Sequence, residues 1–257
     1  MSVIETIKKA RALDEGQVLT SKQSVLSGNA VTGYAVNFPI YGTCQPSKLC
    51  IETCYAGAKS RPITWRASLN KQVSLLNSVR ANPYEVGERI VGELRPKLRR
   101  GLKFLRWNGV GDLFKESVDC LVYVAESLPD LPIWVVTRIP EWAALVPDLP
   151  NVFVHFSLDA PSLDRYERVM GLDPLSSRLF FSYTEGEGEE SQPDELSEIP
   201  ISVYFTHLYK SPAPDGFDRV SCDLNDEEDI KGGCERCGRC WSEDALMIRD
   251  GASRHEV

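Results

Sequence analysis

Residues 133–137 (Ile-Trp-Val-Val-Thr) and 151–158 (Asn-Val-Phe-Val-His-Phe-Ser-Leu) are two short, mostly apolar segments joined by a stretch that favours a helix. Such near-continuous apolar runs predict strands that are buried on both faces, as in parallel sheets. Further strands of this kind are expected at 33–40, 102–107, 178–184 and 199–205. Helical spacing of apolar residues is found at 62–80, 83–100 with an interruption at Pro96, 113–127, 141–146 and 161–170. This alternation predicts an α/β fold whose parallel sheet is covered on both faces or closed as a barrel.

The composition is that of an ordinary globular protein. The 257 residues are 42% apolar and 26% charged, which excludes a disordered tail, a collagen-like repeat and a disulfide miniprotein. The formal net charge of -8 argues against a general coat for nucleic acid or membranes. No apolar run approaches the roughly 20 residues that cross a bilayer, and the N-terminus lacks a secretory pattern. We therefore expect a cytoplasmic protein with no membrane partner.

The chain contains eight cysteines, and in a reducing compartment these call for an explanation other than disulfides. Cys120 lies within an apolar helical pattern and is expected in the core. The remaining cysteines form two groups. We expect residues 1–210 to form a barrel-like domain that includes a cysteine loop at 44–54, and residues 211–257 to form a metal-binding extension.

The second group comprises Cys222, Cys234, Cys237 and Cys240. The last three are separated by two residues each, a spacing that wraps one metal centre and resembles the core of bacterial ferredoxins. A remote thiolate then completes a [4Fe–4S] cluster, and Cys222 is the candidate. The alternative is a Zn²⁺ ion held by the same four thiolates.

The first group comprises Cys44, Cys50 and Cys54. Three thiolates on a [4Fe–4S] cluster leave one iron without a protein ligand, and an open coordination position is what a catalytic metal site needs. A proline and flanking glycines predict that the segment is a loop without a helix or strand. Two alternatives remain open: a zinc site completed by His155 or His207, or cysteines unrelated to a metal.

Polar residues follow the predicted strands at their carboxyl ends, where parallel α/β folds bind ligands. The candidate cofactor-binding residues there are Arg106, Asn108, Gly109, Gly111, Asp112, Arg138, Ser157 and Asp159. Asp112 and His207 are the candidate catalytic residues, with His207 as general acid or base. Alternatively, Asp112 and Asp159 cap the helices that follow them, and His207 is a structural histidine.

Four segments carry a resemblance to a known family. They are Cys44…Cys50…Cys54-Tyr55-Ala56, Arg106-Trp-Asn-Gly-Val-Gly-Asp112, Asn151–Asp159 and the terminal Cys234-x2-Cys237-x2-Cys240-Trp241. Over roughly residues 30 to 241 the chain resembles the phage gene product 88 family, here expected to be iron–sulfur proteins, and more distantly radical-SAM enzymes. The second resemblance implies a partial (βα)6 TIM-like barrel with a three-cysteine [4Fe–4S] cluster after its first strand. It also implies that S-adenosylmethionine (SAM) binds the open iron, with Asp112 as the carboxylate for the SAM amino group.

The resemblance therefore implies an iron–sulfur enzyme of radical-SAM type with a second, auxiliary cluster in its C-terminal extension. Its substrate is not readable from the sequence, and its electron donor would be a protein such as a flavodoxin or ferredoxin. A second hypothesis is an iron–sulfur redox or electron-transfer protein without SAM. A third is a zinc protein that binds nucleic acid or a partner through the basic run Arg95–Lys103, although the net charge does not indicate nucleic acid and basic residues also favour helix ends.

Overall fold

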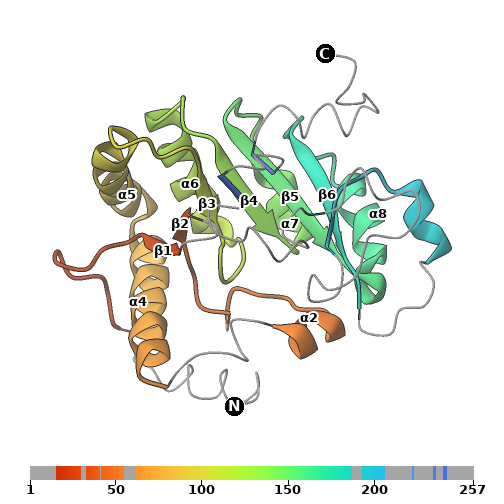
Figure 1. The fold of residues 1–257 in the computed structure, drawn as a ribbon, viewed down its shortest axis with the longest axis horizontal. Helices are drawn as coiled ribbons and strands as arrows, with labels where there is room; N and C mark the ends of the chain where they lie inside the picture. Colours follow the sequence, from red (N-terminus) through yellow and green to blue (C-terminus); the bar gives the residue numbers. More distant parts are fainter. Residues whose placement is uncertain are drawn as a thin grey trace.

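The protein was analysed as a computed structural model that describes residues 16–29, 33–40, 42–54, 62–186, 193–205, 222, 234–235 and 240–241. Its centre is a seven-stranded sheet whose strands lie side by side in chain order (Figure 1). β1 pairs antiparallel with β2, and every later strand is parallel to the strand before it. The strands are β1 (Ser27–Asn29), β2 (Gly33–Val36), β3 (Leu105–Trp107), β4 (Ile133–Thr137), β5 (Val152–Leu158), β6 (Leu179–Thr184) and β7 (Ile201–Phe205).

Helices connect most of the strands. They are α2 (Lys48–Thr53), α4 (Pro62–Ala81), α5 (Pro83–Leu98), α6 (Lys115–Ser127), α7 (Pro140–Leu145) and α8 (Asp164–Gly171), with short 3-10 helices η1 (Ala160–Ser162) and η2 (Asp194–Glu198). Among the described residues, no helix combines the length and apolar character that a membrane crossing requires.

The α/β fold with a mostly parallel sheet is confirmed. Within the described part of the chain the sheet is open, because its edge strands β1 and β7 each pair with one neighbour and not with each other. The short strand β1 pairs with the outer edge of β2. The sequence did not predict β1, because it contains no alternation of apolar and polar residues there. The finer expectation of a radical-SAM barrel stays a prediction.

Two local expectations are wrong. The cysteine loop contains helix α2, which starts because the Ser47 hydroxyl accepts a hydrogen bond from the Cys50 amide at 3.1 Å. Helix α5 is not interrupted at Pro96 and continues to Leu98. A proline in a helix removes the bond to the carbonyl four residues earlier. Here that carbonyl belongs to Gly92, an exposed residue, so water can satisfy it.

The helices cover one face of the sheet. Alternate strand residues belong to one apolar core with residues of α4, α5, α6, α7 and α8. Trp107, Tyr183 and Tyr204 are the largest of these strand side chains, and all three are fully buried. Cys120 lies in the same core, as expected. Because side chains alternate between the faces of a sheet, the intervening residues point to the opposite face.

That opposite face is lined by rings, and we call it the aromatic face, defined by Phe104, Trp134, Phe153, His155 and Phe180. The His155 ring stacks on Phe180 at 5.2 Å between centroids and meets Trp134 edge-on at 6.1 Å. Trp241, near the end of the described residues, stacks on Phe104 at 4.8 Å. The segment after β7 therefore returns to the sheet. The predicted domain boundary at 210 lies outside the described residues.

Candidate functional site

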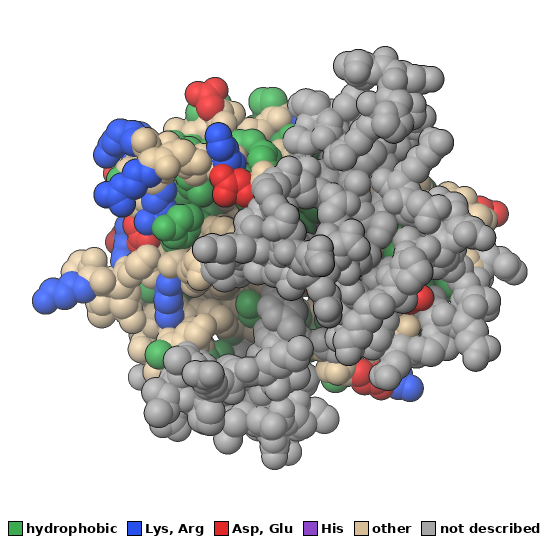
Figure 2. Space-filling model, in the orientation of Figure 1, with side chains coloured by type: hydrophobic (Ala, Val, Ile, Leu, Met, Phe, Trp, Pro, Cys, Tyr) green, Lys and Arg blue, Asp and Glu red, His purple; other side chains and the backbone are tan. Residues whose placement is uncertain are grey.

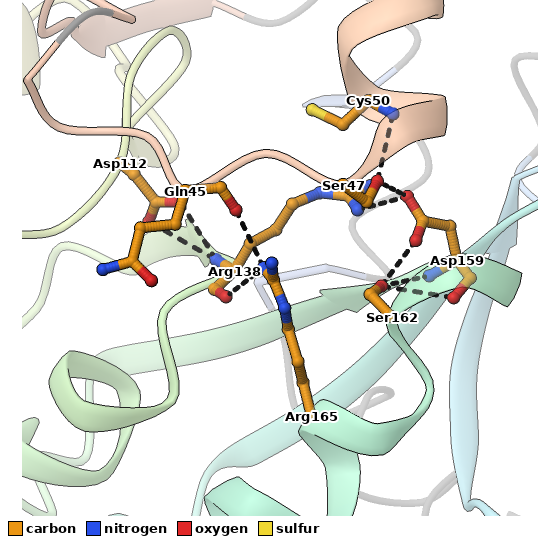
Figure 3. A network of polar contacts seen from close by, with 8 residues as sticks. All are labelled: Gln45, Ser47, Cys50, Asp112, Arg138, Asp159, Ser162 and Arg165. Carbon is orange, nitrogen blue, oxygen red and sulfur yellow. Dashed lines mark hydrogen bonds and ion pairs between the residues drawn. The ribbon is translucent and has the colours of Figure 1, made fainter.

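The cysteine loop lies against the carboxyl ends of β4 and β5 (Figure 3). Cys44, Cys50 and Cys54 are all half-buried. Cys50 and Cys54 are four residues apart at the end of α2, a spacing that places side chains on one face of a helix. Burial is the main cause that raises the pKa of the Cys50 thiol, and the charge of Cys54 adds to the effect, in keeping with that proximity.

Asp159 fastens this loop to the end of β5. Its carboxylate accepts hydrogen bonds from the Ser47 hydroxyl, from Arg138 Nη1 at 2.6 Å and from the Ser162 hydroxyl at 2.5 Å. The Asp159 side chain is 0% exposed and that of Arg138 is 15% exposed. Arg165 adds a second link, because its Nη1 donates to the backbone carbonyls of Gln45 and Arg138. Asp159 also precedes η1 as its N-cap residue, so the capping alternative holds together with this wider role.

Asp112 joins the ends of β3 and β4 to the same loop. Its carboxylate accepts from Thr137 Oγ1 at 2.6 Å, from its neighbour's amide at 2.8 Å and from the Arg138 amide at 3.1 Å. Its own amide donates to Thr43 Oγ1 at 3.2 Å. The alternative that Asp112 caps the next helix is wrong, because α6 begins three residues further on, at Lys115. The N-cap residue of α6 is Phe114, and the Ser117 hydroxyl bonds to both of its backbone groups.

Burial is the largest influence on the Asp112 carboxyl and raises its pKa to about 6, although the bonds from Thr137 and the backbone act in the other direction. In the unfolded chain the pKa is about 3.9. The folded state thus binds the proton more tightly, and this contribution to stability is present below about pH 4 and lost as the pH rises through about 6.

Replacing Asp112→Asn should therefore change the pH dependence of stability. Between pH 4 and pH 7 the variant should gain about 3 kcal/mol relative to the wild type, because a shift of one pKa unit corresponds to about 1.4 kcal/mol. Urea unfolding of both proteins across this range gives the difference, in which all other titrating groups cancel. A pH-independent difference would contradict a raised pKa.

The thiols of Cys44 and Cys50 are not those of a reactive nucleophile. Burial is the main cause that raises the pKa of both Cys44 and Cys50, and the charge of Asp112 adds to the effect at Cys44. Nucleophilic and redox-sensing cysteines need a lowered pKa. A metal ligand, in contrast, is kept as thiolate by the positive charge that it binds. The chemistry of this donor set thus fits a metal centre better than thiol catalysis.

Within the described ranges, no group of three or more His, Cys, Asp or Glu side chains stands in a metal-binding arrangement. His155, the candidate fourth ligand of a zinc site, instead lies on the aromatic face, with its Nε2 3.1 Å from the Cys240 carbonyl oxygen. Cys237 and His207 lie outside the described residues.

Five buried polar atoms of β2, β3, β4 and the residues directly after these strands lack a hydrogen-bond partner. One is Trp107 Nε1 in the helix-side core, and the other four belong to residues outside that core. They are Asn37 Oδ1, Arg106 Nε, Asn108 Oδ1 and Trp134 Nε1. Asn108 also has a positive φ of 60°, an uncommon conformation for a residue with a side chain. Buried polar atoms are nearly always paired, so these four atoms have hydrogen-bonding capacity that a polar ligand could use. We call these four residues the unpaired polar cluster.

In the structure, the predicted cofactor-binding residues fall into those with unpaired polar atoms and those whose bonds hold the cysteine loop. Arg106 and Asn108 have unused hydrogen-bonding capacity, whereas Asp112, Arg138 and Asp159 hold the cysteine loop in place. Ser157 is buried and pairs in register with Ser182. The sequence reasoning missed Asn37 and Trp134. Asn37 lay inside the strand expected at 33–40, but β2 ends at Val36, so only the structure shows that Asn37 directly follows a strand. Trp134 lies inside β4, where only the strand register reveals its neighbours.

Gly109 and Gly111 were expected to let the backbone approach a ligand. A Cβ on Gly109 would lie 2.5 Å from Asn37 Oδ1, and one on Gly111 would lie 2.6 Å from the Phe38 carbonyl oxygen. Both glycines therefore allow close packing against the protein's own chain and not against a ligand. Without a Cβ at these positions, the loop after β3 can lie directly against the end of β2. Phe38 in turn donates its amide to the Val110 carbonyl at 2.9 Å.

The described parts of the terminal cysteine segment meet the sheet. The Cys222 amide donates to the Tyr204 carbonyl at 2.9 Å, and Trp241 Nε1 donates to the Cys234 carbonyl at 3.2 Å. Burial lowers the pKa of His155 to about 4, so its ring is neutral at pH 7. Because the Cys240 carbonyl can only accept a hydrogen bond, His155 Nε2 carries the ring proton.

Comparison with known proteins gives one family. A search of curated proteins and a search of solved structures each found no match. The family model described as "Gene product 88" matches residues 5–243, which include both cysteine groups and every strand of the sheet. On this evidence the chain belongs to the gene product 88 family.

Proposed function

We propose that this protein is an iron–sulfur enzyme of radical-SAM type. Cys44, Cys50 and Cys54 would hold a [4Fe–4S] cluster with one open iron, and a ligand such as SAM would bind between that iron and the sheet. The observation that carries the proposal is the position of the three-thiol loop, which hydrogen bonds to Asp112 and Asp159 fix at the carboxyl ends of parallel strands, the same edge of the sheet at which Asn37 and Asn108 follow β2 and β3.

The unpaired polar cluster matches the polar groups of an amino acid. Arg106 Nε and Trp134 Nε1 are donors suited to a carboxylate, and the side-chain oxygens of Asn37 and Asn108 are acceptors suited to an ammonium group. SAM carries both groups at its amino-acid end. This assignment differs from the expectation that Asp112 takes the amino group, because the bonds of Asp112 already hold the loop.

The described side chains support binding and positioning roles. A [4Fe–4S] cluster with SAM supplies one-electron chemistry, while the protein supplies placement and exclusion of water. Asp112 and Asp159 fix the cysteine loop, and Arg138 links the two carboxylates through its amide and its guanidinium. The cation–π contact of Arg106, 4.6 Å from the Trp134 ring centroid, holds the guanidinium against the sheet.

For the terminal group we propose a second [4Fe–4S] cluster on Cys222, Cys234, Cys237 and Cys240. Cys222 and Cys240 meet the sheet through bonds of their backbone groups to Tyr204 and His155. A redox or electron-transfer protein without SAM and a Zn²⁺ ion at this site are the competing outcomes, and the experiments below separate them.

Anaerobic purification followed by iron, sulfide and zinc analysis tests the metal content. The wild type should be brown and contain about eight irons per chain if both groups hold [4Fe–4S] clusters. Cys54→Ala should lose about four of these irons and keep the terminal cluster. Cys120→Ala is the matched control, because Cys120 is buried in the helix-side core, and it should keep all of the iron. Loss of no iron or of all iron in Cys54→Ala, or zinc in the wild type, would contradict two independent clusters.

Paramagnetic resonance of the reduced protein tests the ligand. Added SAM should change the spectrum of the wild type, and Arg106→Gln should weaken that change while keeping its iron. A wild-type spectrum that SAM leaves unaltered would favour the redox protein without SAM.

A further inference from the structure

A basic cavity lies at the opposite end of the sheet from the cysteine loop. Its volume is about 310 Å³, and its lining residues include Tyr34, Lys97, Arg100, Lys103, Phe104 and Glu235. Lys103 and Phe104 directly precede β3, and Gly33, which also lines the cavity, begins β2. The cavity is therefore at the amino ends of these strands, whereas the cysteine loop is at the carboxyl ends.

Positive charge is concentrated here although the chain as a whole is acidic. The segment from the last turn of α5 to β3 carries Arg95, Lys97, Arg99, Arg100 and Lys103. Across the described residues, the ion pairs are Arg138–Asp159 and Arg168–Glu141, so none of these cations is paired there. Figure 2 shows Lys and Arg side chains gathered over the part of the molecule that Figure 1 labels α5. Glu235 is the acidic residue among the described lining residues.

The faces of the aromatic rings at the cavity are already in contact with other residues of the protein. Lys97 Nζ lies 4.7 Å from the centre of the Tyr34 ring, and a Cβ on Gly28 would lie 3.3 Å from atoms of the same ring. Phe104 stacks on Trp241 with an angle of 9° between the rings. Proteins that recognise single-stranded bases stack them on open aromatic faces. The described rings offer no such face, so recognition at this cavity depends on charge.

We propose that this cavity binds the phosphate backbone of a nucleic-acid strand without reading its bases. Phosphates are the ligands that clustered Lys and Arg side chains neutralise. A strand fits better than a mononucleotide, because exposed Arg95 and Arg99 continue the positive charge along the end of α5 beyond the cavity lining. The basic side chains that carry the proposal all belong to α5 and the segment before β3, so the proposal requires neither SAM nor a cluster on Cys44, Cys50 and Cys54.

Fluorescence anisotropy with a labelled single-stranded DNA of about 20 nucleotides tests this proposal, with the full-length, anaerobically prepared protein in roughly 50 to 200 mM salt. Log K should fall linearly with log salt, with a slope of about -0.7 for each phosphate neutralised. Arg100→Gln combined with Lys103→Gln should make the slope shallower by about 1.4 and weaken binding at the lowest salt about tenfold or more. A homopolymer and a mixed sequence of equal length should bind equally.

The matched control is Lys22→Gln combined with Lys115→Gln. Both lysines are exposed and absent from the described cavity lining, and the change in net charge is the same. Equal loss of binding in the two double variants would overturn the proposal, because it would show attraction to total charge. The proposal would also be overturned by an absence of DNA binding at the lowest salt, by equal affinity for adenosine monophosphate or inorganic phosphate, or by binding to anionic lipid vesicles but not to DNA.

Discussion

Replacing Asp159→Ala should destabilise the protein by about 3 kcal/mol and release the cysteine loop from the end of β5. The variant removes the acceptor of the Ser47 and Ser162 hydroxyls and leaves the guanidinium of Arg138 without its carboxylate. Removing one partner of a buried ion pair is costly because the other charge stays in a poorly solvated place. Urea unfolding at neutral pH, with wild type and variant at equal metal content, measures the loss.

Glu141→Ala is the matched control for this prediction. It breaks the other described ion pair, between Arg168 and Glu141, whose side chains are 61% and 38% exposed. Exposed pairs contribute little because water screens both charges, so the control should change stability by no more than about 0.5 kcal/mol. Equal effects of the two variants would show that Asp159 does not fasten the loop. Selective loosening of the loop should also speed labelling of Cys50 by a thiol reagent in metal-free Asp159→Ala.

Replacing Gly111→Ala should cost about 3 kcal/mol, with two separate causes. Gly111 has a φ of 84°, and a residue with a Cβ pays about 1–2 kcal/mol in the left-handed region. The new Cβ would also lie 2.6 Å from the Phe38 carbonyl oxygen, a backbone atom that cannot rotate away. Overpacking of this kind typically costs about 1–3 kcal/mol. Urea unfolding gives the total.

Gly101→Ala separates the two causes. Gly101 has a φ of 90°, and a Cβ there would meet no atom within 4 Å. This variant should therefore pay only the conformational cost of about 1–2 kcal/mol. The difference between the two variants measures the contact between the loop after β3 and the end of β2. Equal losses would mean that the loop can shift away from Phe38 at no cost.

Much of the fold could be predicted from the sequence, because a strand that is buried on both faces must be apolar along its whole length. For this reason β4, β5 and β6 lie where 133–137, 151–158 and 178–184 predicted them. The short elements were not predictable in the same way. β1 has three residues and depends on pairing with β2, and α2 depends on the cap at Ser47 inside a segment whose proline and glycines indicate a loop.

The candidate site shows the same division. The sequence by itself determined that polar residues follow the strands and that seven of the eight cysteines fall in two groups, because both facts are properties of local order. Only the tertiary structure decided which of these polar residues have capacity left for a ligand. Asp112, Arg138 and Asp159 hold the cysteine loop, whereas Arg106 and Asn108 keep buried atoms without partners. The physical reason is that hydrogen-bond pairing depends on strand register and loop packing, which join residues that are far apart in the chain.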